Sequence, residues 1–399
     1  MGFLEEFQAN DKRGLFKSDN TTFTFPTGFK ALDYANGYYQ TVKVNGEYQY
    51  IKRLGIAPGF ITVIGTTGVG KSTFCLCVCG NIIRQYKNAQ MIYHDCEQTM
   101  TMQRIIEVTG CNPDDQRFIL NKTNTSIEDV LEMLDIICER KEANKNEIMI
   151  TVTDQSIDGK PYKIYPPTIM VIDSLPSFNS KEYDDKTLGS NIDGMRGSKD
   201  VSRFFSNCLD KCTKYNIIFL VINHIRPKAE MNPYAQPPKG LMMLGQMEQL
   251  PRGAVAQYYS NTYFRINGKR SDAYTMDDNG FSGFKCMVQL AKTKTNVVGT
   301  SFPMAFTGNG FDPYYSIYEY ASSLGVIQGR NPYLYFVGLE DLKFSRKDFV
   351  SRMKYEDGFG VRVMEVMQPY FDMLLGNKPK LNLADNEQDK VFDLAAADY

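Results

Sequence analysis

The chain has 399 residues, of which 43% are hydrophobic and 23% charged, and its formal net charge is −1. This composition is typical of a protein that buries a core and stays soluble, and the near-zero charge excludes a chain that attracts polyanions through its overall charge. No segment approaches the roughly 20 consecutive apolar residues of a membrane span. The acidic start, MGFLEEFQAND, lacks the features of a signal peptide, so we expect a cytoplasmic protein without a membrane partner.

Strands and helices are predicted to alternate from residue 60 onward, which is the pattern of a parallel α/β sheet. The predicted strands are short and apolar: Phe60–Ile64, Met91–Asp95, Thr168–Asp173, Ile217–Asn223 and Phe284–Lys292. The predicted helices are Phe3–Gln8, Ser72–Tyr86 and one that ends at Arg140. Thr125 and Glu128 are expected to form a capping box at the start of that last helix.

Two stretches interrupt this alternation. Residues 144–167 are predicted to contain a hairpin with its turn near Asp158 and Gly159. Residues 226–258 are rich in methionine, glutamine and proline and have no periodicity, so they are predicted to form a long loop. A loop of this length in a compact domain usually has a function.

These patterns divide the chain into a short N-terminal segment (1–45), a core (46–327), a small C-terminal region (328–378) and a tail (379–399). The tail carries five acidic residues and one lysine from residue 385 onward. We therefore expect the tail to be mobile.

Residues 65–73, with the sequence GTTGVGKST, satisfy the pattern G-x-x-x-x-G-K-[ST] between a predicted strand and a predicted helix. Glycine lets the backbone approach phosphate oxygens closely, and the free N–H groups at the start of the helix supply positive potential. Lys71 is expected to reach the β- and γ-phosphates of ATP, and the Ser72 hydroxyl is expected to bind Mg²⁺. The predicted ATP-binding residues of this loop are Gly65, Thr66, Thr67, Gly68, Val69, Gly70, Lys71, Ser72 and Thr73.

Polar residues follow three other predicted strands. Asp173 ends a buried strand, where it is expected to hold Mg²⁺ through water. Glu97 lies just beyond another strand and is the candidate for the group that activates water. His224 follows a third strand and is expected to sense the γ-phosphate, the alternative being a histidine of the core. His94 faces the other side of its strand and is expected to be structural.

The order of these elements resembles the RecA recombinase family, and within it the UvsX-like recombinases of T4-type phages. The similar segments follow one another over most of residues 55–327. They are GFITVIGTTGVGKST, RQYKNAQMIYHDCEQTMT, TIMVIDSLPS, IIFLVINHIRP and KTKTNVVGTSFPMAFTGNGFDPYYSIYEYASSLGVI. The phosphate loop is shared by many ATPases, whereas the last segment separates recombinases from ring helicases of the same class.

The resemblance implies a RecA-type P-loop ATPase core with a mostly parallel central sheet, and an N-terminal segment that docks on a neighbouring protomer. It implies that Glu97 is the catalytic glutamate and His224 the γ-phosphate sensor. Lys292 and Lys294 match a lysine pair that completes the neighbour's nucleotide site. Tyr314 matches an aromatic residue near the neighbour's adenine. Arg104 matches a residue that stacks on adenine within the same protomer.

The resemblance also implies two DNA-binding loops, at Ser177–Arg203 and Arg226–Tyr258. The second loop is longer and poorer in glycine than the family pattern, and the hairpin within residues 144–167 has no counterpart in the family. The predicted DNA-binding residues are Arg196, Lys199, Arg226, Lys228, Arg252 and Gly253.

The resemblance and the motifs together indicate a DNA-dependent ATPase that forms helical filaments on single-stranded DNA, with ATP at protomer interfaces. Such a protein pairs single-stranded with homologous double-stranded DNA and promotes strand exchange in recombination and repair, here in the cytoplasm of a phage-infected bacterium. Two alternatives stay open: a hexameric DNA helicase motor with the same core fold, and a nucleotide-gated assembly protein without a DNA role.

Overall fold

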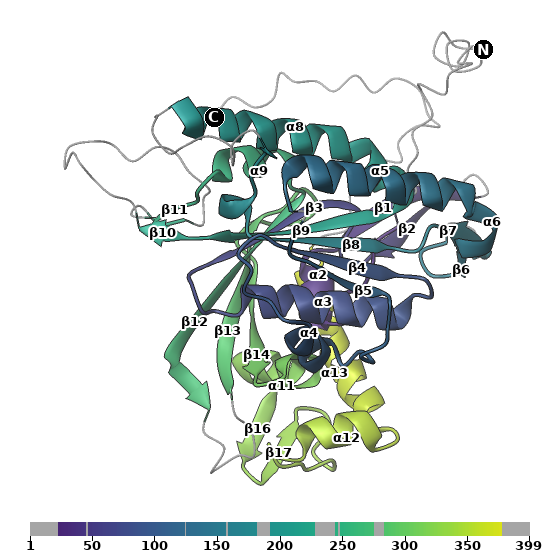
Figure 1. The fold of residues 1–399 in the computed structure, drawn as a ribbon. Helices are drawn as coiled ribbons and strands as arrows, with labels where there is room; N and C mark the ends of the chain where they lie inside the picture. The colour runs from purple at the N-terminus through teal and green to yellow at the C-terminus, as the bar shows by residue number, and fades with distance from the viewer. Residues whose placement is uncertain are drawn as a thin grey trace, which may run out of the picture.

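A computed structural model describes residues 23–44, 47–123, 125–156, 159–181, 192–227, 244–245, 248–274 and 283–376. Within these ranges a nine-stranded sheet forms the centre of the molecule (Figure 1). Its strands lie in the order β15 (Gly310–Asp312), β14 (Ser301–Thr307), β13 (Gly283–Lys292), β12 (Thr262–Tyr274), β3 (Gly59–Gly65), β9 (Ile217–His224), β8 (Thr168–Asp173), β4 (Gln90–Asp95) and β5 (Phe118–Asn121). The strands from β12 to β5 run parallel, and β13, β14 and β15 extend the sheet in antiparallel fashion. The predicted mixed α/β fold with a mostly parallel sheet is confirmed.

Helices cover both faces of this sheet. The helices α3 (Lys71–Gln85) and α4 (Met102–Thr109) lie on one face, and α5 (Ile127–Ala143) and α8 (Ile192–Tyr215) lie on the other (Figure 1). Strands covered on both faces are expected to be apolar along their whole length, and β3 and β8 are buried at every residue. The five predicted strands and the predicted helix Ser72–Tyr86 are each confirmed to within one residue.

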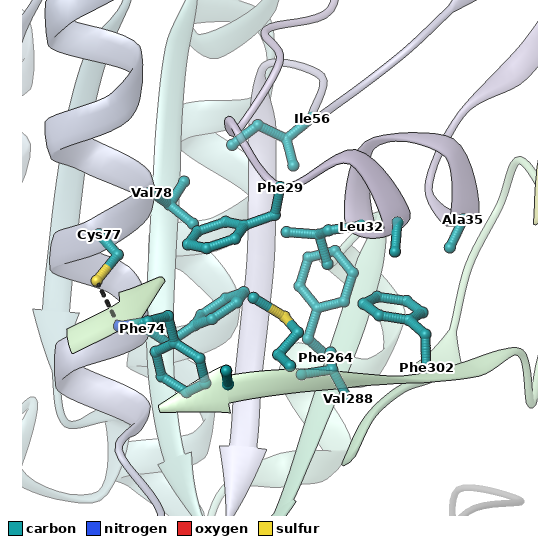
Figure 2. Packing of buried hydrophobic residues seen from close by; sticks show 14 of the residues in the cluster. Phe29, Leu32, Ala35, Ile56, Phe74, Cys77, Val78, Phe264, Val288 and Phe302 are labelled. Atoms are coloured by element: carbon teal, nitrogen blue, oxygen red, sulfur yellow. Dashed lines mark hydrogen bonds between the residues drawn. The ribbon is translucent and has the colours of Figure 1, made fainter. Parts of the chain in front are cut away.

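Aromatic side chains fill the core between α3 and the sheet. The rings of Phe29 and Phe74 stack with their centroids 6.4 Å apart, and Phe74 packs edge-on against Phe264 of β12 at 6.0 Å. Figure 2 shows these rings together with Cys77, whose sulfur accepts a hydrogen bond from the Phe311 backbone N–H at 3.3 Å. Burial raises the pKa of the Cys77 thiol to about 12, so this cysteine acts as a small buried residue.

The first and last parts of the described chain pack against each other. The short helix α2 (Lys30–Ala35) and the hairpin of β1 (Tyr38–Val44) and β2 (Glu47–Arg53) precede the central strands, so the boundary expected at 45/46 falls between two paired strands. The C-terminal elements are α11 (Pro313–Ser323), β16 (Ile327–Arg330), β17 (Tyr333–Phe336), α12 (Phe349–Tyr355) and α13 (Phe359–Leu374). The rings of Tyr34 and Phe371 lie 5.6 Å apart, and the Asn296 side chain donates to the Ala35 carbonyl oxygen at 2.8 Å.

The predicted hairpin within residues 144–167 is confirmed. After the short helix α6 (Lys145–Ile148), the strands β6 (Ile150–Val152) and β7 (Tyr162–Ile164) pair in antiparallel fashion. Gly159 belongs to the connection with φ +72°, whereas Asp158 lies outside the described residues. The Gln155 side chain accepts from the Thr24 N–H at 3.1 Å and donates to the Thr24 carbonyl at 2.7 Å. The hairpin therefore fastens the N-terminal segment to the core.

The capping box predicted for α5 is displaced by one residue. Ser126, not Thr125, is the N-cap: its side chain accepts from the Asp129 N–H at 3.2 Å, and the Asp129 carboxylate accepts from the Ser126 N–H at 3.3 Å. Glu128 instead accepts a hydrogen bond from the Lys181 N–H at 3.0 Å. The helix also runs on to Ala143, beyond the predicted end at Arg140.

The prediction that residues 226–258 lack regular structure is wrong at both ends. β10 (Arg226–Pro227) pairs with β11 (Glu248–Gln249), and α9 (Gly253–Tyr259) follows. Residues 228–243 and 246–247, like the predicted helix Phe3–Gln8 and the tail from residue 379, lie outside the described residues. Among the helices that the structure describes, none is long and apolar enough to cross a lipid bilayer.

Candidate active site

Four neighbouring strands end at the same edge of the sheet, and the predicted site residues lie there. Because the strands are parallel, their registers align these ends: Gly65 of β3 pairs with His224 of β9, and Asp173 of β8 pairs with Asp95 of β4. β9 lies between β3 and β8, so His224 is placed between the glycine loop (residues 65–73) and Asp173. The carboxyl edge of an open parallel sheet is the usual place for a ligand.

Glycines at two positions of this loop have no room for a side chain. A Cβ at Gly70, where φ is +89°, would lie 2.7 Å from the Phe306 ring, and a Cβ at Gly65 would lie 2.7 Å from the Ile266 carbonyl oxygen. The loop leads directly into the 15-residue helix α3, whose first N–H groups are available to an anion. These two glycines let the loop pack closely against β12 and β14, and with the helix start beside it the loop is a candidate anion cradle.

Lys71 is the first residue of α3, and its ammonium group folds back over the loop. Its Nζ donates to the Thr66 carbonyl oxygen at 2.8 Å, and the residue is only 4% exposed. Burial lowers the pKa of Lys71 to about 8, while the carboxylates of Asp173 and Glu97 act in the opposite direction. An anion in the cradle would compensate this buried positive charge.

Ser72 and Asp173 form the second part of the site. Ser72 Oγ donates to Asp173 Oδ2 at 2.7 Å, and the Tyr93 hydroxyl donates to the same oxygen. Burial raises the pKa of Asp173, whereas the hydrogen bonds from Tyr93 and Ser72 lower it. A serine hydroxyl and a carboxylate are the oxygen ligands that Mg²⁺ prefers. This pair therefore fits the predicted Mg²⁺ site.

Glu97 lies in a tight turn that follows β4. The Met100 N–H donates to Asp95 Oδ2 at 2.7 Å, and the Cys96 N–H donates to the Asp173 carbonyl oxygen at 2.7 Å, so both ends of the turn are fixed. The Ser174 hydroxyl donates to Glu97 Oε1. The turn thereby aims the Glu97 carboxylate at the glycine loop.

His224 lies beside this carboxylate rather than in the core. Its Nε2 is 3.3 Å from Glu97 Oε1, and ligand atoms of Glu97, Asp173 and His224 all lie within 4.8 Å of one another. Burial, followed by the Lys71 ammonium, lowers the pKa of His224, whereas the Glu97 and Asp173 carboxylates raise it. The structure therefore places His224 at the site and not in the core, while its role as a γ-phosphate sensor stays a prediction.

His94 behaves as the structural residue that was expected. It is fully buried, and its Nδ1 lies 3.2 Å from the Asn121 side-chain nitrogen on β5. Burial lowers its pKa to about 4. A neutral histidine in that position links β4 to β5.

The two predicted adenine contacts have partners on other elements. The Arg104 guanidinium, on α4, donates to the Gly308 carbonyl oxygen at 3.2 Å and contacts Glu107 at 3.5 Å. Tyr314, on α11, has the Lys354 ammonium 5.5 Å from its ring centroid.

The lysine pair lies two strands away from β3, and Lys292 is level with the middle of β3 rather than with the glycine loop at its end. Lys292 is paired with Tyr263, and Tyr263 is paired with Thr62, three positions before the loop begins. Lys292 Nζ donates to the Ser260 carbonyl at 2.9 Å and to the Gln257 carbonyl, which places the ammonium at the end of α9. Burial and the neighbouring Lys294 charge lower the pKa of Lys292. Lys294 is exposed, and neither lysine lies at its own protomer's glycine loop.

The predicted DNA-binding residues differ in their exposure and in their contacts. Arg252 NH2 donates to Asn179 Oδ1 at 2.6 Å and NH1 donates to the Phe178 carbonyl, so this guanidinium holds the segment after β8. Lys199 and Arg226 are exposed. Arg196 belongs to α8, Gly253 is the first residue of α9, and Lys228 lies outside the described residues.

Sequence reasoning missed two polar contacts of the site, those of Tyr93 and Ser174. A signal for each exists, since Tyr93 alternates with Asp95 on one face of β4 and Ser174 directly follows Asp173. Comparisons with models of protein families and with curated proteins find no match for this chain.

Proposed function

We propose that the chain is an ATP-dependent DNA recombinase of the RecA type, which forms helical filaments on single-stranded DNA and promotes pairing and strand exchange. The observation that carries the ATPase part is the meeting of Lys71, Ser72 and Asp173 with Glu97 and His224 at one sheet edge. Fixed positive groups, a metal-ligand pair and an acid beside them are the parts that phosphoryl transfer requires.

In this mechanism Lys71 and the N–H groups at the start of α3 bind the β- and γ-phosphates. Glu97 orients a water molecule and accepts its proton as the water oxygen bonds to the γ-phosphorus and the bond to the bridging oxygen breaks. The Ser174 hydroxyl holds the carboxylate in place, and the His224 ring lies beside it. When bound at Ser72 and Asp173, Mg²⁺ supplies positive charge to the phosphates.

The recombinase part rests on the resemblance and on the lysine pair. Lys292 and Lys294 lie away from their own glycine loop, so a role for them at a nucleotide requires a second protomer. An interface of that kind gives the lysine-bearing end of β13 a role in assembly. It is compatible with a filament and with a ring, so the hexameric helicase motor is the second candidate.

Electron microscopy of the full chain tests the proposal. With ATP and single-stranded DNA we expect open helical filaments, and with DNA but no nucleotide we expect few or none. Closed rings would favour the helicase motor, and polymers that form equally without DNA would favour an assembly protein. Hydrolysis that single-stranded DNA does not stimulate would contradict a DNA-dependent ATPase.

A further inference from the structure

Tyr93 is a buried tyrosine that the mechanism above does not use. It lies on β4 with no exposed surface, and its hydroxyl donates to Asp173 Oδ2. Ser72 Oγ donates to that same oxygen at 2.7 Å. Tyr93 precedes Asp95 by two residues and so projects from the same face of β4, and Asp95 is the register partner of Asp173.

A buried phenol needs a hydrogen-bond partner, and a backbone carbonyl satisfies Tyr320 in this way elsewhere in the chain. Tyr93 instead donates to an ionisable carboxylate of the candidate metal site. Two donors on Oδ2 fix the rotation of the carboxylate group. Among the described residues, no hydrogen bond reaches the other oxygen, Oδ1, which leaves it available to accept from a water molecule on a metal ion.

We propose that Tyr93 is a positioning residue for the Mg²⁺ site, holding Asp173 so that Oδ1 faces a metal-bound water while Ser72 Oγ ligates the ion. This inference rests on the proposed ATPase function. Without the phenol hydroxyl, the Asp173 carboxylate must be oriented when the ion binds, and the affinity for the ion falls. Nucleotide binding without metal is unaffected, because Lys71 and the N–H groups of α3 hold the phosphates.

The test compares Tyr93→Phe with the unaltered chain by thermal unfolding in ADP over a series of Mg²⁺ concentrations. We expect the half-saturating Mg²⁺ concentration to rise roughly tenfold, which is the size expected for one lost hydrogen bond to a charged group. The shift in Tm that ADP gives without metal should stay the same. Tyr320→Phe, which removes a buried hydroxyl far from the site, is the matched control and should leave the Mg²⁺ curve unchanged.

A double variant separates this role from simple stabilisation. If Tyr93 acts through Asp173, then Tyr93→Phe/Asp173→Ala should have the same Mg²⁺ curve as Asp173→Ala and should unfold at no lower temperature. A lower Tm for the double variant, or an unchanged curve for Tyr93→Phe, overturns the inference. Absence of any Mg²⁺-dependent ADP binding by the unaltered chain would instead remove the proposed function on which it rests.

Discussion

Glu97 lies in the turn after β4 and His224 ends β9, yet His224 Nε2 lies 3.3 Å from Glu97 Oε1. Burial and the Lys71 ammonium lower the pKa of His224, which favours the neutral ring beside the carboxylate. This contact joins the turn after β4 to the end of β9. The segment that follows β9 is the second predicted DNA loop, so under the proposed function the pair would lie between the nucleotide and that loop.

Glu97→Gln should bind ATP normally and hydrolyse it about 10²- to 10⁴-fold more slowly, because the amide keeps the shape but accepts no proton. Steady-state hydrolysis and equilibrium binding of ATP measure the two effects separately. His224→Asn serves as a comparison, since it removes the ring but leaves the acid. Turnover of Glu97→Gln within a few-fold of the unaltered chain would assign the base to another residue.

Lys71→Ala should abolish tight binding of ATP, because the phosphates lose the buried ammonium that closes the loop. The measurement is calorimetric titration with ATP and Mg²⁺. Lys87→Ala is a useful control, since this lysine follows the other end of α3 and is exposed. Normal hydrolysis by Lys71→Ala would contradict the central claim about the loop.

Lys292→Ala/Lys294→Ala should bind nucleotide as a protomer, yet lose DNA-stimulated hydrolysis and filament formation together. Lys294→Ala alone removes the exposed lysine and keeps the contact of Lys292 with the end of α9. A loss of activity in this variant would therefore come from the shared nucleotide site and not from a disturbed α9. Mixing the double variant with Glu97→Gln should restore part of the activity, because one kind of mixed interface is intact. No recovery in co-assembled mixtures would count against a shared site.

Arg226→Ala/Lys228→Ala should weaken binding of single-stranded DNA and reduce the salt slope by about 0.7 for each lost phosphate contact. Arg252→Ala should behave differently, because its guanidinium holds Phe178 and Asn179. We expect that variant to lower the Tm. Fluorescence anisotropy at several salt concentrations, with Tm measured alongside, distinguishes the two effects. An unchanged salt slope in the first variant would remove residues 226–228 from the DNA interface.

Lys141 gives a prediction about stability and pH. Its buried ammonium donates to the Pro166 and Tyr215 carbonyls at 2.7 and 2.8 Å, and burial lowers its pKa to about 7. An unfolded lysine has a pKa of about 10.4, so between about pH 7 and 10 the unfolded chain binds more protons than the folded chain. The free energy of unfolding therefore rises with pH across that window, by at most about 1.4 kcal/mol per unit, and is flat below it.

Lys141→Met keeps the length of the side chain but cannot titrate. The Tm of the unaltered chain minus that of Lys141→Met should therefore increase from pH 7 to pH 9. A difference that stays constant over this range would mean that Lys141 remains protonated in the folded chain.

The elements of the sheet could be predicted because each central strand is a short apolar run between polar turns. The glycine loop and the acids after the strands could be predicted for a related reason, since parallel strands bring their carboxyl ends together. Lys71, Ser72, Asp173, Glu97 and His224 all meet as that rule requires.

What could not be predicted depends on contacts between distant segments. Thr125 with Glu128 and Ser126 with Asp129 both fit the sequence pattern of a capping box, and only the backbone shows that Ser126 is the N-cap. The hydrogen-bond partner of Lys292 could not be predicted, because α9 lies within a stretch of the sequence that has no periodicity. The hydrogen bond of Tyr93 likewise requires the register of β4 against β8.

The packing of α2 against α13 has a consequence for the order in which the chain is made. Tyr34 packs on Phe371, and the Ala35 carbonyl accepts from Asn296, so these two partners of α2 are synthesised about 260 to 340 residues after it. At about 20 residues per second, translation takes on the order of 15 s to reach them. During that time the Tyr34 ring lacks its partner on α13, and apolar surface of α2 that is exposed in the unfinished chain favours binding to chaperones and aggregation until α13 leaves the ribosome.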